Sequence, residues 1–282
     1  ISEFTGRPLA LVANAYARIG VRNRFLLEVL GDEVFRRRGQ LEPQSIALVL
    51  NAHARLEIPN PVLFDYFAQD VPRRMKGHNL HSLCLVASAY ARTGRAEAAL
   101  FEKIGDFACA QAKSLYPRAV ASLLYAFSEV DLRHGVLFFN APSHIAEHVS
   151  AYSTDELAMV ARAYGHFQMV HLQLFDTITS ALPSRVLVEA RSVPLLPGTE
   201  EEEEAEDEEA PLAESGERQV EPAQLVPRVS SLVWFMEAYA RLTIFEAEAL
   251  RLLSDAIAAR SAELEREPQL AVQALRAAAA LS

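Results

Sequence analysis

The chain has 282 residues, of which 51% are hydrophobic, so it can bury a sizeable core and is not disordered as a whole. Every apolar stretch is shorter than the roughly 20 residues that a membrane-spanning helix needs. The two cysteines are too few for a disulfide scaffold or a zinc module. The sequence has 11 glycines and no phosphate-loop motif, which argues against a nucleotide-binding enzyme. The net charge of −10 comes from one segment, because residues 189–223 hold 13 of the 37 acidic residues.

An internal repeat of 37 residues runs through the sequence. The string Asn-Ala-Tyr-Ala-Arg-Ile-Gly at 14–20 returns at 51–56 and 88–94, and weaker copies follow at 125–128, 162–165 and 237–241. We call its central residue the ring position. It is occupied by Tyr16, His53, Tyr90, Phe127, Tyr164 and Tyr239. The first four steps are 37 residues long and the last is 75, so one extra segment of about 38 residues separates the fifth copy from the sixth.

Each copy is predicted to form two helices. Apolar residues seven, four and three positions before the ring position give the stripe of a helix. The residue just before the ring position is alanine in all six copies and the residue just after it is Ala, Ser or Gly, so neighbouring helices are expected to approach closely there. A second apolar anchor lies 11 residues after it, at Leu27, Phe64, Phe101, Phe138, Phe175 and Leu250. The sequence therefore predicts an all-α fold, a right-handed α-solenoid of six helical-hairpin repeats with a partial seventh that begins near Pro268.

These repeats divide the chain into three parts. Residues 1–188 hold repeats one to five, and residues 224–282 hold repeat six and the first helix of repeat seven. The acidic segment 189–223 has dense like charge and no apolar face, so we expect a flexible insertion. The alternative is a functional acidic arm that contacts a basic partner or shields the groove.

The strings Leu9–Gly20 and Leu83–Gly94, together with the period, resemble the heptatricopeptide repeat family, which is related to octotricopeptide and FAST-kinase-type organellar proteins. The resemblance implies a mitochondrial or plastid protein that binds organellar RNA, including ribosomal RNA. Many members carry a RAP domain with a nuclease-like fold, and no part of this sequence resembles it. That absence favours a scaffold.

Catalytic motifs are weak in this sequence. His144 and His148, with Glu147 between them, match the His-x-x-Glu-His pattern of one class of zinc protease, but no third ligand is evident. His53 stands at the ring position and is interpreted as a packed substitute for tyrosine. We therefore expect no enzyme activity, metal, cofactor or small-molecule substrate.

Two polar sets recur with the repeat. The first-helix set lies two residues before and two after the ring position, on one helix face that is predicted to lie opposite the packed stripe. Its predicted RNA-binding members are Asn14, Arg18, Asn51, Arg55, Ser88 and Arg92. The second-helix set lies near the ends of second helices, and its predicted RNA-binding members are Arg36, Arg37, Arg38, Arg73, Arg74 and Lys76. An amide and a guanidinium in each repeat can read a base edge and hold a phosphate.

Basic residues also favour helix C-termini without any ligand, because they interact with the helix dipole. Within the first-helix set, Glu129 and Glu237 interrupt the positive charge, so repeats one to three are the better RNA candidates. The sequence thus favours a non-catalytic RNA-binding scaffold that belongs, with other proteins, to a mitochondrial ribosome or a related RNA–protein complex. The alternative is a protein–protein adaptor in such a complex without RNA contact.

Overall fold

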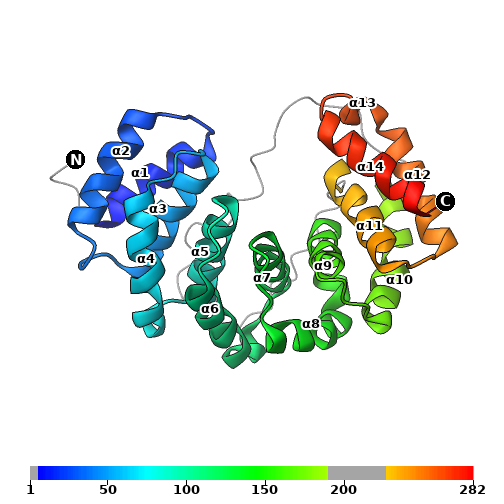
Figure 1. The fold of residues 1–282 in the computed structure, drawn as a ribbon, viewed down its shortest axis with the longest axis horizontal. Helices are drawn as coiled ribbons and strands as arrows, with labels where there is room; N and C mark the ends of the chain where they lie inside the picture. Colours follow the sequence, from blue (N-terminus) through cyan, green and yellow to red (C-terminus); the bar gives the residue numbers. More distant parts are fainter. Residues whose placement is uncertain (1–5, 190–226, 282) are drawn as a thin grey trace. The chain divides into compact units, whose positions relative to one another are not determined.

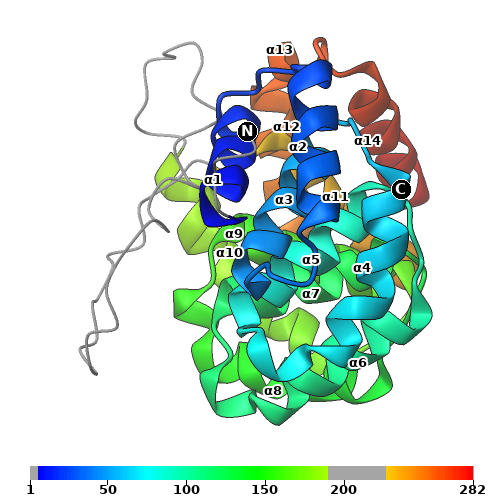
Figure 2. The same ribbon diagram turned by 90° about the vertical axis from the view of Figure 1, so that its left-hand side faces the viewer.

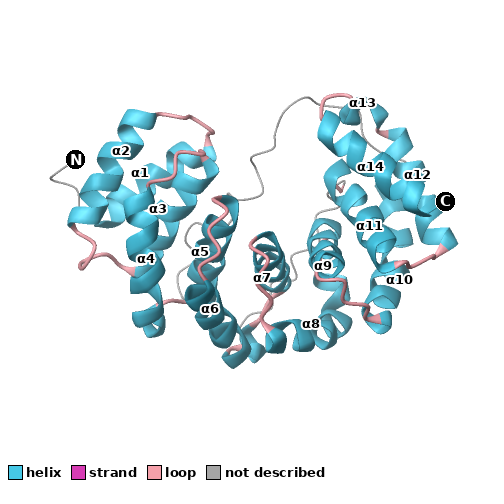
Figure 3. Cartoon of the chain, viewed as in Figure 1, coloured by secondary structure: helices cyan, strands magenta, loops and turns pink. Residues whose placement is uncertain are grey.

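A computed structural model describes residues 6–189 and 227–281. Within these ranges the chain forms helices and no strand, which confirms the predicted all-α class (Figure 3). The predicted insertion lies outside the described residues, apart from Glu189 at the end of α10. None of the helices in the described ranges combines the length and hydropathy needed to cross a membrane.

First and second helices alternate along the chain. The first helices are α1 (Gly6–Arg18), α3 (Pro43–Arg55), α5 (Leu80–Arg92), α7 (Pro117–Glu129), α9 (Thr154–His166), α11 (Val229–Leu242) and α14 (Pro268–Leu281). The second helices are α2 (Arg24–Arg36), α4 (Pro61–Arg73), α6 (Ala98–Ala110), α8 (Gly135–His148), α10 (Leu172–Glu189) and α12 (Ala247–Ala259). Short turns follow several second helices: η1 (Met75–Gly77), η2 (Ala112–Ser114), η3 (Val149–Ala151) and α13 (Ser261–Leu264).

The chain forms two compact units, of which unit 1 holds the described residues 6–110 and unit 2 holds 111–189 and 227–281. In unit 1, α1, α3 and α5 pack side by side in one layer, with α2, α4 and α6 in the other (Figure 1). The first hairpin, α1 and α2, is dark blue in the side view of Figure 2. In unit 2, α7, α9, α11 and α14 form one layer and α8, α10 and α12 the other. Within each unit this is the packing of an α-solenoid.

The two helices of each hairpin are joined by the same turn. Four residues after each ring position the backbone is left-handed, at Gly20, Glu57, Gly94, Asp131, Gln168 and Thr243. The next N–H then donates to the carbonyl of the ring residue, as from Arg95 to Tyr90 and from Met169 to Tyr164. This is a Schellman motif, which satisfies the last carbonyls of a helix and reverses the chain. It fixes where the first helices from α1 to α11 end.

The ring residues connect neighbouring hairpins. Tyr90 is fully buried, and its hydroxyl donates to the carbonyl oxygen of Phe64 on the preceding second helix at 2.6 Å. The Tyr164 hydroxyl donates to Phe138 in the same way at 2.5 Å. The rings also contact these anchors, with centroids 5.1 Å apart for Phe64 and Tyr90. Each of these rings is therefore part of the contact between two hairpins rather than the core of one.

Small side chains beside the ring position let first helices approach closely. A Cβ atom added to Gly165 would lie 2.9 Å from the Cα atom of Ala238 on the neighbouring helix α11. Carbon atoms in contact are normally 3.5–4.0 Å apart, so even alanine at position 165 would push α9 and α11 apart. The predicted role of the small residues is confirmed at this contact.

Two histidines in unit 1 are buried with one unpaired ring nitrogen each. His53 is 1% exposed, its Nδ1 lies 2.8 Å from the carbonyl oxygen of Ile58, and its Nε2 has no partner. His78 is 5% exposed, its Nδ1 lies 3.1 Å from the hydroxyl oxygen of Ser82, and its Nε2 also lacks a partner. Burial lowers the pKa of His53, and burial together with the positive charge of Arg74 lowers the pKa of His78 to about 4. Both rings are therefore neutral in the folded protein near pH 7.

We expect truncation of Tyr90 to alanine to lower the free energy of unfolding by about 3–5 kcal/mol, because a fully buried aromatic ring is lost. Tyr90→Phe removes only the hydrogen bond to Phe64 and should cost about 1 kcal/mol. Tyr16 is the matched control, because it occupies the ring position of the first hairpin but is only half-buried. Urea unfolding followed by circular dichroism measures all three. An equal loss for Tyr16→Ala and Tyr90→Ala would contradict the packing described.

We also expect the free energy of unfolding to decrease as the pH is lowered from about 6.5 to 4. The unfolded chain binds protons at its histidines in this range, whereas folded His78 binds one only near its lowered pKa of about 4. Unfolding in urea at pH 7.5, 6 and 5 measures the slope. His78→Gln should make the slope smaller, because it removes the ring whose pKa is lowered in the folded protein. An unchanged slope for His78→Gln would show that this ring does not control the acid sensitivity.

Candidate nucleic-acid interface

The arginines of the first-helix set in unit 1 recur at one structural position. Arg18, Arg55 and Arg92 are the last residues of α1, α3 and α5, which pack side by side. Arg92 is exposed, and the other two are half-buried. Adjacent helices lie about 8–10 Å apart, so the three guanidinium groups form a row at one end of this layer. A single-stranded backbone can follow such a row.

The partner positions of these arginines are less open than expected. Asn14 and Ser88 are half-buried, and Asn51 is only 6% exposed. The prediction that this position faces away from the packed stripe is wrong for Asn51, because α3 is covered by α1 on one side and α5 on the other. An amide buried in this way has little edge to offer a base. In unit 1 the arginines remain the stronger candidates.

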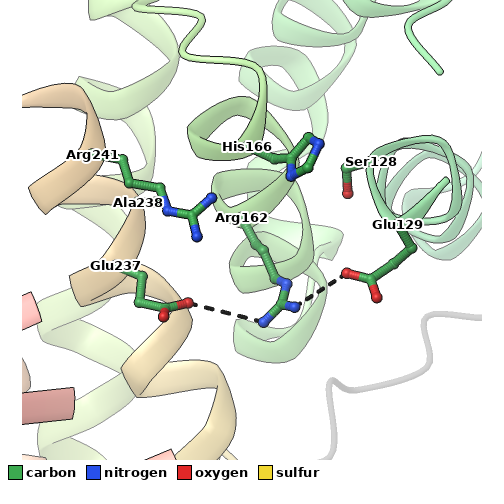
Figure 4. Close-up of a pocket in the computed structure, with 7 residues that line it drawn as sticks. All are labelled: Ser128, Glu129, Arg162, His166, Glu237, Ala238 and Arg241. Atoms are coloured by element: carbon green, nitrogen blue, oxygen red, sulfur yellow. Dashed lines mark hydrogen bonds and ion pairs between the residues drawn. The ribbon is translucent and has the colours of Figure 1, made fainter. Parts of the chain in front are cut away.

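In unit 2, the face of the first helices that corresponds to the first-helix set carries a cluster of interacting side chains (Figure 4). Arg162 on α9 pairs with Glu129 on α7 at 3.1 Å and faces Glu237 on α11 at 4.0 Å. Its guanidinium carbon also lies 4.8 Å from the ring centroid of Trp234, which stacks on Tyr125 at 5.3 Å. The cluster links three first helices and neutralises their central arginine. The predicted interruption of the positive charge at Glu129 and Glu237 thus has a structural basis.

Arg74 of the second-helix set follows the end of α4 and contacts the segment that precedes α3, the first helix of the same hairpin. Its guanidinium donates to the carbonyl oxygens of Leu41 at 2.6 Å and Arg38 at 3.5 Å, just before α3 begins, and pairs with Asp70 at 3.2 Å. Arg185 donates to Tyr152 and Val149, and Arg260 to Pro227, at the corresponding places in unit 2. These arginines stand 21 residues after their ring positions and satisfy carbonyls that the turn leaves without helical partners. A structural role therefore accounts for this position.

The remaining members of the second-helix set differ in what they contact. Arg36 and Arg37 both pair with Glu33, and hydrogen bonding to Arg36 is the main reason that the pKa of Glu33 falls to about 2. Arg38 lies over the ring of Phe35, 4.4 Å from its centroid. Arg73 and Lys76 are exposed. Of this set, Arg73, Lys76 and the outer side of Arg36 can reach a ligand in solvent.

Charge differs between the units. Residues 6–110 carry 14 basic and 10 acidic side chains, a net of +4. The described residues of unit 2 carry 11 basic and 14 acidic side chains, a net of −3. An anionic polymer is attracted to the first composition and repelled by the second. On charge, unit 1 is the better surface for RNA.

The histidine pair of the protease-like motif is engaged in packing. The Nδ1 of His144 lies 2.9 Å from the hydroxyl of Tyr152, and its Nε2 lies 3.2 Å from the carbonyl oxygen of Leu115. The rings of His144 and His148 stack at 4.5 Å. With both nitrogens of His144 hydrogen-bonded, this ring has no lone pair directed at a metal. Two other histidines, His134 and His171, cap second helices by accepting from Leu137 and Leu174, a role that the sequence reading missed.

A comparison with protein families identifies the chain. The profile of the RNA-editing substrate-binding complex 6 protein family matches residues 1–173, more than half of the sequence. The chain belongs to this family. No curated protein shows a significant similarity to it. The match covers unit 1 and the hairpin α7–α8, and extends through α9. The resemblance to heptatricopeptide repeats stays a prediction.

We expect Arg74→Ala to lower the free energy of unfolding by about 1–3 kcal/mol, because two carbonyl oxygens and Asp70 lose a charged donor. Arg73 is the matched control, since it is adjacent, exposed and has the same charge. Arg73→Ala should change stability by less than about 0.5 kcal/mol. Thermal and urea unfolding of both variants measure the difference. Equal effects at the two positions would show that Arg74 does not hold the hairpin.

Proposed function

We propose that this protein is a non-catalytic helical-repeat subunit of a mitochondrial RNA–protein complex that handles RNA-editing substrates, and that it binds single-stranded RNA along unit 1. The family match carries the first part of this proposal, because the family is named for an RNA-editing substrate-binding complex. It favours an editing complex over the ribosomal assembly suggested by the sequence. A plastid complex is the alternative location.

The arginine row supports the second part. Arg18, Arg55 and Arg92 recur every 37 residues at the ends of neighbouring helices, and unit 1 has a net charge of +4. Lysine and arginine contacts to phosphates supply most sequence-independent affinity for nucleic acid. The surface lacks a clear base-reading amide in its middle repeat, because Asn51 is buried. We therefore propose RNA binding with weak sequence preference, in which the row orients the strand.

Replacing Arg18, Arg55 and Arg92 together with glutamine tests this proposal. The loss of three phosphate contacts to single-stranded RNA should lower the slope of log affinity against log salt by about 2, since each contact contributes roughly 0.7. Fluorescence anisotropy of a labelled 20-nucleotide single-stranded RNA between 50 and 300 mM KCl measures the slope. Circular dichroism verifies that the variant remains folded.

Two matched variants separate specific contact from general charge. Arg118, Arg251 and Arg276 are exposed arginines of unit 2, and their replacement with glutamine removes the same net charge. This control should leave the slope almost unchanged. Glutamine at Arg36, Arg73 and Lys76 tests whether RNA follows the second helices instead. If none of the three variants alters RNA affinity, the adaptor function without RNA contact replaces this proposal.

A further inference from the structure

Unit 2 exposes large apolar side chains along one edge. They lie in the turns that lead into the second helices and in the first turns of those helices: Val136 and Phe139 on α8, Val170 and Leu172 at α10, and Phe245 before α12. Phe139 is 81% exposed, Leu172 69% and Phe245 63%. We call these five residues the apolar edge. Burial elsewhere in these helices is complete for Phe138 and Phe175, so the edge is not a consequence of poor packing.

The helices that carry the apolar edge lie in one layer. α8 packs against α10, and α10 packs against α12. Their starts correspond in the repeat, at residues 135, 172 and 247. With neighbouring helices about 8–10 Å apart, the edge extends over roughly 20 Å. This is about the length of a 13-residue helix laid across the three.

Carboxylates surround the apolar edge. Asp131, Asp176, Glu246 and Glu248 lie in these turns or near the starts of these helices, and all four are exposed. Asp131 also pairs with His166 at 2.9 Å. Glu246 is the N-cap residue of α12 and Glu248 lies in its first turn, so both closely follow Phe245 in the chain. The basic side chains nearby are fewer, since Arg251 faces Asp255 in its own helix at 3.9 Å and Arg133 is the other arginine of these turns.

We propose that the apolar edge of unit 2 binds a basic amphipathic helix of a protein partner. Clustered exposed apolar side chains are typical of interaction surfaces, and their hydrophobic burial would supply the affinity. The surrounding carboxylates select lysine and arginine at the rim of the partner helix. The linear extent of the edge matches three to four helical turns, so an apolar stripe at i, i+3, i+4, i+7, i+11 and i+14, which is about 21 Å long, can contact all three second helices.

The same charges exclude the two other occupants. RNA phosphates would meet Asp176, Glu246 and Glu248, which repel them. A second copy that used the same edge would bring these carboxylates against their own counterparts. A basic partner helix avoids both conflicts. The proposal is independent of RNA binding by unit 1, because it rests on different residues.

Peptide binding to the full chain tests the proposal. The probe is a fluorescein-labelled 18-residue peptide with leucine at i, i+3, i+4, i+7, i+11 and i+14 and lysine at the other positions. One control peptide carries glutamate in place of lysine, and the other has the same composition in scrambled order. Anisotropy at 150 mM salt should give at least tenfold tighter binding for the lysine peptide than for either control.

Protein variants locate the site. Replacing Phe139, Leu172 and Phe245 together with serine should weaken lysine-peptide binding at least tenfold, and the thermal melt should be unchanged because all three are exposed. Phe25→Ser in unit 1 is the matched control, since that ring is 77% exposed but lies outside the apolar edge. Replacing Asp176, Glu246 and Glu248 with their amides should weaken binding and reduce its salt dependence.

Several outcomes would overturn the proposal. Equal affinity for the lysine and glutamate peptides, or full binding by the triple serine variant, would show that the edge does not select a basic helix. Loss of single-stranded RNA binding in the triple serine variant would make the edge an RNA surface. Sedimentation that shows a dimer of the natural chain and a monomer of the variant would mean that a second copy covers the edge.

Discussion

The contact between a ring residue and the second helix of the hairpin before it is the interaction on which each unit depends. Tyr90 and Tyr164 bury their rings against Phe64 and Phe138 and donate their hydroxyls to the carbonyl oxygens of those same residues. Tyr239 contacts Phe175 and places its hydroxyl 2.5 Å from that of Thr179. Because the ring is completed by a neighbour, a hairpin cannot bury it alone, and stability is shared between adjacent repeats.

Two local features keep the geometry of the hairpins similar enough for them to stack. At the closed end, the left-handed residue four positions after the ring sets the angle between the two helices, even where it is Glu57 or Gln168 rather than glycine. At the open end, Arg74 and Arg185 hold the chain that leads into the first helix. The ring, the turn and the arginine keep the 37-residue spacing in three dimensions.

The sequence predicted the elements better than the surfaces. The period located the helices, because the ring position and the second anchor are both buried apolar positions that repeat. It did not distinguish Arg73 from Arg74, since the carbonyl oxygens that engage Arg74 come from a connection 33 residues earlier. It also placed Asn51 on an open face, whereas neighbours from α1 and α5 cover it. The repeat marks the position of Arg74, Arg185 and Arg260, but it does not identify the backbone atoms that these side chains contact.

The surfaces of the two units differ because the repeat constrains only a minority of positions. The ring, its small neighbours, the second anchor and the hairpin arginine are fixed by packing, and the outer positions are not. In unit 1 the ends of the first helices carry Arg18, Arg55 and Arg92, whereas in unit 2 the equivalent face is closed by Arg162 between Glu129 and Glu237. Closing that face neutralises the charge that would attract RNA, and the exposed apolar side chains of unit 2 lie instead along the starts of its second helices. The same repeat therefore gives unit 1 a net positive charge and unit 2 a net negative charge, although both units expose apolar side chains at the starts of second helices, such as Phe25 and Val62 in unit 1. The proposed RNA contact of unit 1 follows this difference in charge, because phosphates are attracted to a basic surface and repelled by an acidic one.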